Sequence, residues 1–366
     1  MQQERNSNFE LLRSIAMFMI VVWHVIIHGK LLENAAGPLH FLLVIILFIC
    51  IIHVNTFMLI TGYFQYDKKF KLGKFIKIFL ESIFYNVIIN LLFYITGISN
   101  KGSLNLIIDT YILNCPYWFL SSYLLLYLLS PFINKLISAL SKKEHLSLIL
   151  LSSFIYFIIP YVSLGRFLSN NGYNIQQFII FYLIGSYLNK YKVNLFENKS
   201  IFKQRLYLLL IICFCLFINI ISLYGFRHIF SDIVKLDFLT NFVNTHYLDY
   251  CNPIVVIQTI ATFMLFKTFN IKSLFINNLA RTTFGIYLIH ENEFVRSNLY
   301  KLLNIDRGMI ETSYFNIIKI FYYSIIIFFA CAIIDRIRIK LIEDRKWYNN
   351  IIDKIEKFIN KIITEG

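Results

Sequence analysis

The stretch FELLRSIAMFMIVVWHV, residues 9–25, decides the fold class, because it is an apolar run of membrane-spanning length that carries ionisable side chains. Arg13 and His24 are eleven positions apart, and eleven residues of an α-helix turn through about 1100°, which leaves the two side chains about 20° apart. They are separated by about 16 Å along the axis, and Glu10 joins the same stripe. Ionisable groups at bilayer depth are costly unless they line a polar interior, so the stripe indicates a functional path. The structural alternative is a snorkelling arginine with an interfacial histidine.

The whole chain has the composition of an integral membrane protein. Of its 366 residues, 58% are hydrophobic and 15% are charged, and the mean hydropathy is +0.63. A soluble domain of this length does not have such a composition. The first apolar run has no small-residue cleavage site after it, so we expect a retained helix and not a signal peptide. The abundance of Ile, Asn, Lys, Phe and Tyr favours a bacterial source with an AT-rich genome.

Apolar runs long enough to cross a bilayer recur along the whole sequence. They predict an all-α, polytopic bundle of about ten transmembrane helices. The ninth run contains GIYLIHENEFVRSNLY, which is too polar to face lipid along its whole length. The expected spans are 9–29, 40–62, 75–97, 117–137, 146–163, 173–190, 205–225, 252–270, 279–300 and 316–338.

The distribution of Lys and Arg predicts the topology. Loops after even-numbered spans hold 16 basic residues, whereas loops after odd-numbered spans hold 8. Because cytoplasmic loops carry the excess of basic residues, both termini are expected in the cytoplasm. An odd number of spans would place the basic tail outside, against the same rule. We therefore predict a multi-pass protein of the bacterial inner or plasma membrane, oriented N-in and C-in.

The net charge of +14 follows from this topology and does not require a nucleic-acid partner. Basic side chains in short cytoplasmic loops face anionic membrane lipids. The segment YNNIIDKIEKFINKII has apolar residues at helical spacing, which favours an amphipathic helix on the inner leaflet. We therefore expect a transmembrane domain over 1–340 and a basic amphipathic cytoplasmic tail over 341–366. The oligomeric state is not encoded in any pattern that we recognise.

The cysteines and histidines give weak signals for covalent or metal sites. Cys115 and Cys251 fall at the outer ends of two predicted spans, so a disulfide between them remains open. His24 and His28 have the i, i+4 spacing of metal ligands, but no third ligand is evident beside them. We therefore expect no metal.

Several segments in order resemble acyltransferase family 3, the polytopic membrane acyltransferases that modify bacterial surface glycans. That family has an Arg and a His with ten residues between them in its first helix, as Arg13 and His24 are here. TFMLITGYF resembles its segment ending in a Ser-Gly-aromatic turn, with Thr61 in place of Ser. FKLGKFIKI resembles the basic start of its third helix, with Lys74 and Lys77 where many members have Arg. PYWFLSSYLLLYLLSPF, NPIVVIQTIATFMLF and TFGIYLIHE continue the resemblance to residue 291.

The resemblance implies an O-acyltransferase that uses acyl-coenzyme A, most simply acetyl-coenzyme A, as co-substrate. His24 is the expected general base, because its unperturbed pKa lies near operating pH. Arg13 is an expected catalytic residue and an expected contact of the acyl-coenzyme A donor, and Glu10 is an expected catalytic residue beside it. Lys74 and Lys77 are expected to contact the phosphates of the donor, although they satisfy the positive-inside rule in any case. A surface polysaccharide or lipid-linked glycan is the expected acceptor.

Four further residues are weaker candidates for substrate contact. His290 and Glu291 form a second ionisable cluster, at the end of the motif TFGIYLIHE. Trp118 fits sugar stacking and an outer aromatic belt alike. Glu81 lies within a predicted span, where it is expected either to orient an imidazole or to pair with Arg13.

Two other functions are compatible with the sequence. A transporter or glycan exporter would also need charged intramembrane residues, although it does not need the spacing of Arg13 and His24. An acyltransferase whose acceptor is a lipid or a small molecule at the inner face would share the same motifs. The sequence names neither the sugar, nor the hydroxyl position, nor the length of the acyl chain.

Overall fold

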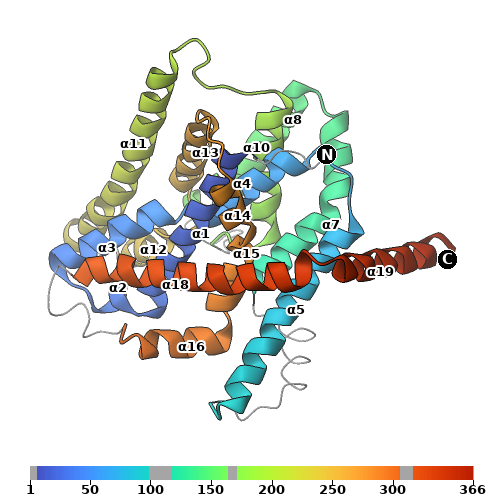
Figure 1. Cartoon of the computed structure of the whole chain (residues 1–366). Coiled ribbons are helices and arrows are strands. Elements are labelled where there is room, and N and C mark those ends of the chain that lie inside the picture. Colours follow the sequence, from blue (N-terminus) through green and yellow to red (C-terminus); the bar gives the residue numbers. More distant parts are fainter. Residues whose placement is uncertain (1–5, 99–116, 164–170, 306–315, 366) are drawn as a thin grey trace. The chain divides into compact units, whose positions relative to one another are not determined.

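The computed structural model describes residues 6–98, 117–163, 171–305 and 316–365, and every regular element within those ranges is helical (Figure 1). The predicted all-α class is confirmed. Seven segments in the described part of the chain are long and apolar enough to cross a membrane. They are Ser7–His28, Gly37–Gln65, Leu72–Ile95, Trp118–Ala139, Lys142–Tyr161, Ile201–His228 and Ile317–Glu343.

Three of the ten predicted spans differ from this set. The sixth and eighth are helices α10 (Ile175–Lys190) and α13 (Pro253–Lys267), which have 16 and 15 residues. At 1.5 Å per residue they reach about 24 Å, which is short of a hydrocarbon core of about 30 Å. The predicted ninth span is wrong, because 279–300 is divided among three short helices (Figure 1).

Those three helices are α14 (Leu274–Arg281), α15 (Thr283–His290) and α16 (Glu293–Leu302). The break before α16 has a local cause. The side chain of Asn292 accepts a hydrogen bond from the backbone N–H of Phe294, which is the N-cap arrangement that starts a new helix. Polar residues therefore interrupt the run at the point where a membrane span would have to continue.

The chain forms two compact units, and α1 (Ser7–His28) contributes to both of them. The first, called unit 1, comprises Met1–Trp23, Ala35–Lys68 and Leu128–Asn277. Its helices are α3 (Gly37–Cys50), α4 (His53–Gln65), α8 (Lys142–Ser153), α9 (Ile159–Val162), α10, α11 (Ile201–His228), α12 (Asp237–His246) and α13, with the ends of α1 and α7 (Trp118–Ala139) that fall in these ranges and two π-helical turns, η2 (Phe154–Ile158) and η3 (Ile229–Ile233).

Unit 1 is organised around the contact between α4 and α10. A Cβ atom added at Gly62 would collide with the backbone of Tyr182, and one added at Gly185 would collide with the backbone carbonyl of Leu59. Only glycine allows the two helix backbones to approach so closely, as small residues do at helix interfaces in membranes. The N-terminal part of α1 packs on the same unit through Phe9, whose ring centroid lies 4.9 Å from that of Phe263.

The second compact unit, called unit 2, comprises His24–Asn34, Lys69–Tyr127 and Asn278–Gly366. Its helices are α2 (Leu31–Asn34), α5 (Leu72–Ile95), α15, α16, α18 (Asn316–Arg338) and α19 (Lys346–Glu365), with parts of α1, α7 and α14 and the π-helical turn η4 (Ile339–Glu343). A Cβ atom added at Gly285 would collide with the carboxyl group of Asp335, so α15 packs tightly on α18. Helix α15 also packs on α5.

The C-terminal tail is helical, as the amphipathic pattern predicts. Helix α19 buries Ile352 and exposes Phe358, and Lys77 of α5 donates a hydrogen bond to Asn349 at 2.7 Å. The tail therefore packs on α5 within unit 2. Its position on the inner leaflet, and the division at residue 340, stay predictions.

Candidate active site

The candidate active site lies in unit 2, at the C-terminal ends of α1 and α15. His24 and His28 are one helical turn apart on α1, so they share a face. His290 is the last residue of α15 and is fully buried, and Glu291 follows it at the C-cap. Two segments separated by more than 250 residues thus contribute to one cluster of ionisable groups.

The distances within this cluster are those of hydrogen bonds and ion pairs. His24 Nδ1 lies 3.0 Å from His290 Nε2 and 3.1 Å from Glu291 Oε2. The same carboxylate oxygen lies 3.3 Å from His28 Nε2, and Arg296 Nη1 lies 2.7 Å from Glu291 Oε1. We call these five residues the histidine cluster. Its central carboxylate is in contact with three basic side chains.

The hydrogen-bond partners determine which ring nitrogens carry protons in the neutral state. His290 Nδ1 lies 2.6 Å from the backbone carbonyl of Ile286, which can only accept, so Nδ1–H donates and Nε2 holds a lone pair. His24 Nδ1 must then carry a proton and donate it to His290 Nε2. In a neutral imidazole the second nitrogen has no proton, so Nε2 of His24 is the basic atom.

The charges of the cluster agree with this assignment. Helix α15 and Glu291 lie outside the seven segments long enough to span a membrane. Burial raises the pKa of the Glu291 carboxyl group. The neighbouring His24 and His28 together lower it by more, so the pKa of Glu291 is below the usual range. Burial lowers the pKa of His290, which favours its neutral form. An ionised carboxylate and a neutral histidine thus flank His24.

A buried tyrosine supports the turn that carries His290 and Glu291. The hydroxyl group of Tyr117 donates to the backbone carbonyl of Leu288 at 3.0 Å, and it accepts a hydrogen bond from Asn292 Nδ2 at 3.3 Å. Tyr117 is only 1% exposed. The sequence placed Tyr117 only in an outer aromatic belt and favoured its neighbour Trp118 for substrate contact; the ring of Trp118 lies 6.1 Å from that of Phe119.

Arg13 and Glu10 pair with each other in unit 1. Arg13 Nη1 lies 2.9 Å from Glu10 Oε2, and the Arg13 side chain is 29% exposed. The two residues are one helical turn apart on α1, so this pairing is local. Glu10 and Arg13 therefore lie side by side, as the sequence predicts, and their catalytic and donor-binding roles stay predictions.

Lys74 and Lys77 lie in the first two turns of α5, in unit 2. Lys74 Nζ is 4.9 Å from the ring centroid of Tyr127, and Lys77 Nζ is 5.9 Å from that of Tyr348. Both lysines therefore rest against tyrosine rings within the protein. Contact with donor phosphates stays a prediction.

Glu81 pairs with an arginine of its own unit. Its Oε1 lies 2.8 Å from Arg338 Nη2, and Arg338 Nε lies 2.6 Å from Asp335 Oδ1. The hydroxyl group of Tyr85 donates to the same Asp335 oxygen at 2.6 Å. Arg338 of α18, far away in sequence, thus contacts both carboxylates of this network, and the sequence did not indicate this partner. The pairing of Glu81 with Arg13 or with an imidazole stays a prediction. A structural role for Glu81 accounts for these contacts.

The histidine cluster also has the spacing of a metal site. His24, His290 and Glu291 each offer one ligand atom, and these atoms lie within 4.8 Å of one another. No third ligand is evident in the sequence, whereas the structure brings His290 and Glu291 beside His24. The expectation of no metal stays a prediction. The hydrogen bonds explain the distances of 3.0 and 3.1 Å without an ion, so the mechanism proposed below uses none.

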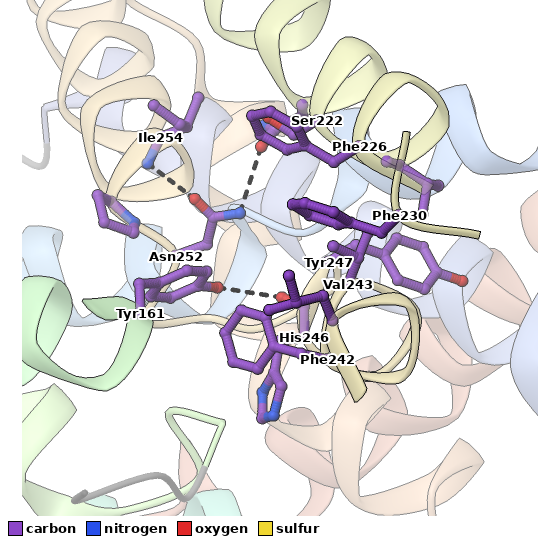
Figure 2. A pocket seen from close by; sticks show the side chains of 14 residues that line it. Tyr161, Ser222, Phe226, Phe230, Phe242, Val243, His246, Tyr247, Asn252 and Ile254 are labelled. Carbon is purple, nitrogen blue, oxygen red and sulfur yellow. Dashed lines mark hydrogen bonds between the residues drawn. The ribbon is translucent and has the colours of Figure 1, made fainter. Parts of the chain in front are cut away.

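Unit 1 also contains a cavity that is lined in part by a histidine. The cavity has a volume of about 350 Å³, and aromatic side chains of α11, η3 and α12 line much of it (Figure 2). His246 contributes to the lining, and its Nδ1 lies 2.7 Å from Asp249 Oδ2. Figure 2 shows the hydroxyl group of Tyr161 donating to the backbone carbonyl of His246, and Asn252 accepting from the backbone N–H of Ile254. We call this the aromatic pocket.

The structure describes one of the two cysteines at the ends of predicted spans. Cys251 is buried in unit 1, and Cys115 lies outside the described residues. A disulfide between them therefore stays open.

Long apolar helices together with a buried cluster of ionisable side chains define the class of the molecule as a polytopic helical membrane protein. Comparison with known families then gives the activity. Residues 6–336 match the acyltransferase domain of acyltransferase family 3, nearly the whole chain, so the protein belongs to that family. It is therefore a membrane acyltransferase. No curated protein and no solved structure matches the chain.

Proposed function

We propose that the protein is an O-acyltransferase that moves an acyl group from acyl-coenzyme A to a hydroxyl group of an envelope glycan. Acetyl is the simplest acyl group, and the bacterial inner or plasma membrane is the expected location. The observation that carries the proposal is the position of His24 Nδ1, 3.0 Å from His290 Nε2 and 3.1 Å from Glu291 Oε2. An imidazole held on one side in this way presents its other nitrogen as a general base.

The proposed step uses His24 twice. Nε2 removes the proton of the acceptor hydroxyl group while that oxygen attacks the carbonyl carbon of the thioester. The new C–O bond forms, the C–S bond breaks, and the departing thiolate of coenzyme A takes the proton from the His24 imidazolium. Glu291 stabilises the imidazolium by its charge, and His290 holds the ring orientation. The products are an ester and free coenzyme A, so the step needs no further reactant.

The donor is proposed to meet the basic residues Arg13, Lys74 and Lys77. Coenzyme A carries phosphate groups, which cationic side chains bind by charge and hydrogen bonding. The predicted N-in topology supports this assignment, because acyl-coenzyme A is cytoplasmic. Lys74 and Lys77 supply charge but not the bidentate geometry of arginine.

Reconstitution of the whole chain tests the proposed reaction. Proteoliposomes receive radiolabelled acetyl-coenzyme A together with envelope glycan from cells that lack the protein. We expect release of coenzyme A and alkali-labile label on the glycan. Label that appears only in the lipid or small-molecule fraction would replace the glycan by a different acceptor. Glycan movement across the membrane without release of coenzyme A would favour an exporter and overturn the proposal.

Cysteine labelling tests the topology on which transfer to a surface glycan depends. In a background without native cysteines, Asp237→Cys should react with an impermeant maleimide in intact cells, because 226–251 is a predicted outer loop. Lys199→Cys should react only after permeabilisation, because 190–205 is a predicted inner loop. The opposite pattern would place the donor residues on the side where acyl-coenzyme A is absent, and transfer to an outer glycan would be abandoned.

A further inference from the structure

A cationic cavity adjoins the histidine cluster in unit 2. It has a volume of about 490 Å³, and its lining comprises His28, Gly29, Lys30, Arg296, Ser297, Tyr300, Lys301, Asn304 and Ile305. This volume is typical of sites that hold a small molecule or a few sugar units. The described lining residues include three permanent cations and no carboxylate. The cavity therefore attracts negative charge.

The cavity is joined to the proposed base through shared residues. His28 lines the cavity, and its Nε2 also lies 3.3 Å from Glu291 Oε2. Arg296 likewise lines the cavity and contacts Glu291 through Nη1, while its side chain stays 38% exposed. A molecule bound in this cavity would thus touch side chains, those of His28 and Arg296, that also contact the Glu291 carboxylate beside His24.

A buried hydroxyl group in the lining points to a polar occupant. Tyr300 is 5% exposed, and its hydroxyl group has no hydrogen-bond partner among the described residues. A buried hydroxyl group without a partner costs free energy, which a ligand with an acceptor oxygen would recover. An apolar ligand would leave this cost in place.

The cations of this cavity come from two distant segments of the sequence. Lys30 lies two residues after the end of α1, whereas Arg296 and Lys301 lie on α16. The fold therefore gathers three basic side chains around one cavity. A binding role for the charge explains this concentration.

We propose that this cavity binds the acidic group of a negatively charged acceptor saccharide, either a carboxylate or a phosphate, next to the hydroxyl group that becomes acylated. The inference rests on the proposed function, because it names the class of acceptor that reaches His24. Lys30 and Lys301 supply the attraction, Tyr300 donates a hydrogen bond, and Arg296 contributes charge while it holds Glu291.

Direct binding tests this inference without the reaction. The full chain is placed in nanodiscs of phosphatidylcholine, and binding is measured by equilibrium dialysis. The first probe is trigalacturonate, and its neutral control is the fully methyl-esterified trimer. The second probe is maltotriose with a terminal phosphate, and its neutral control is maltotriose. We expect at least one acidic probe to bind about tenfold or more tightly than its neutral control, with an advantage that shrinks as salt is raised.

Variants assign the selectivity to the cavity. Lys30→Gln and Lys301→Gln should each weaken binding of the acidic probe about two- to fivefold, and the double variant should weaken it further. Lys235→Gln is the matched control, because Lys235 is also a basic residue of a predicted outer loop and has the same left-handed backbone as Lys30, with φ of 55° at both positions. Tyr300→Phe should weaken the acidic probe more than the neutral one, because a hydrogen bond to an ionised oxygen is the stronger.

Three results would overturn the inference. They are equal affinity for acidic and neutral probes, equal effects of the cavity variants and Lys235→Gln, and loss of probe binding when phosphatidylglycerol is added to the nanodisc. The last result would mean that a lipid headgroup is the occupant. Failure of the proposed reaction has a separate signature, since coenzyme A release can fail while selective binding persists, and selectivity can fail while release persists.

Discussion

Two regions of this protein each pair a histidine with a carboxylate, and they differ in how the pair is made. In the aromatic pocket of unit 1, His246 and Asp249 are three residues apart, at the end of α12. In the histidine cluster of unit 2, His24 meets Glu291 and His290 across more than 250 residues of sequence. The local pair forms wherever that turn forms, whereas the long-range pair exists only in the folded unit.

The two histidines also differ in what their partners do. The described contacts of His246 include one carboxylate and, through its backbone carbonyl, the hydroxyl group of Tyr161. His24 has a carboxylate and a second imidazole, and that imidazole is oriented by the backbone carbonyl of Ile286. A carboxylate beside Nδ1 favours a proton on that nitrogen in both histidines, but His24 is also held by a second imidazole whose own orientation is fixed. We therefore assign catalysis to His24, and the predictions below test that contrast.

The largest expected effect separates the two histidines directly. His24→Ala should lower acyl transfer by about 10²- to 10⁴-fold, the usual contribution of a general base. His246→Ala should lower it by less than about threefold, because its partner is local and aromatic side chains line much of its pocket. Label transfer from acetyl-coenzyme A to glycan, at equal amounts of folded protein, measures both variants. Comparable losses in the two variants, or more than about a tenth of the activity left in His24→Ala, would contradict the assignment.

The second effect tests the long-range partner of His24. His290→Ala should lower kcat about 10- to 100-fold and change the pH profile of kcat, because the base remains while its tautomer and orientation are no longer held. His145→Ala is the matched control, since His145 of unit 1 is equally buried. Both variants should lose thermal stability, but only His290→Ala should change the pH profile. Identical profiles would reduce His290 to a packing residue.

A smaller effect is expected at the other local pair of unit 1. Arg13→Lys keeps the charge beside Glu10 but loses the planar guanidinium that contacts phosphate through two nitrogens. We expect kcat/KM for acyl-coenzyme A to fall about three- to tenfold, with little change in the acceptor KM. Steady-state kinetics with varied donor measures this. Unchanged donor kinetics would make Arg13–Glu10 a structural pair, as the local geometry alone would suggest.

The smallest effect concerns stability and not activity. Burial raises the pKa of Asp249 to about 6, although the hydrogen bond with His246 opposes the rise. Since the folded protein binds this proton more tightly than the unfolded chain does, its stabilising effect is complete below the ordinary pKa of aspartate and is lost as the pH rises through about 6. Asp249→Asn removes this dependence.

The melting temperature of Asp249→Asn, measured in detergent by intrinsic fluorescence, should therefore exceed that of the wild type at pH 8 and approach it at pH 4. Acyl transfer at pH 8 should be retained. A lower melting temperature at pH 8 would mean that the ionised Asp249 stabilises the fold. Loss of transfer with intact folding would transfer catalytic importance to the aromatic pocket.

The sequence determined the class of the protein, because apolar length and charge distribution are local properties of the chain. It also predicted Arg13, His24 and His290 from a motif, and α1 from its apolar run. The predicted ninth span was wrong for a local reason. Helix α15 ends at its C-cap residue Glu291, and the N-cap Asn292 starts α16, where a span would need apolar residues.

Only the tertiary structure decided which ionisable groups meet. Nothing within ten residues of His24 reveals that His290 and Glu291 reach its Nδ1, or that Arg296 and His28 share the Glu291 carboxylate. Nor does the sequence near Glu81 indicate Arg338 as its partner. Helix α15 packs on α5 and α18, with a close approach at Gly285, and such packing between distant segments is not written in a local pattern. A linear pattern records which side chains share one helix face, and the fold alone brings faces of different helices together.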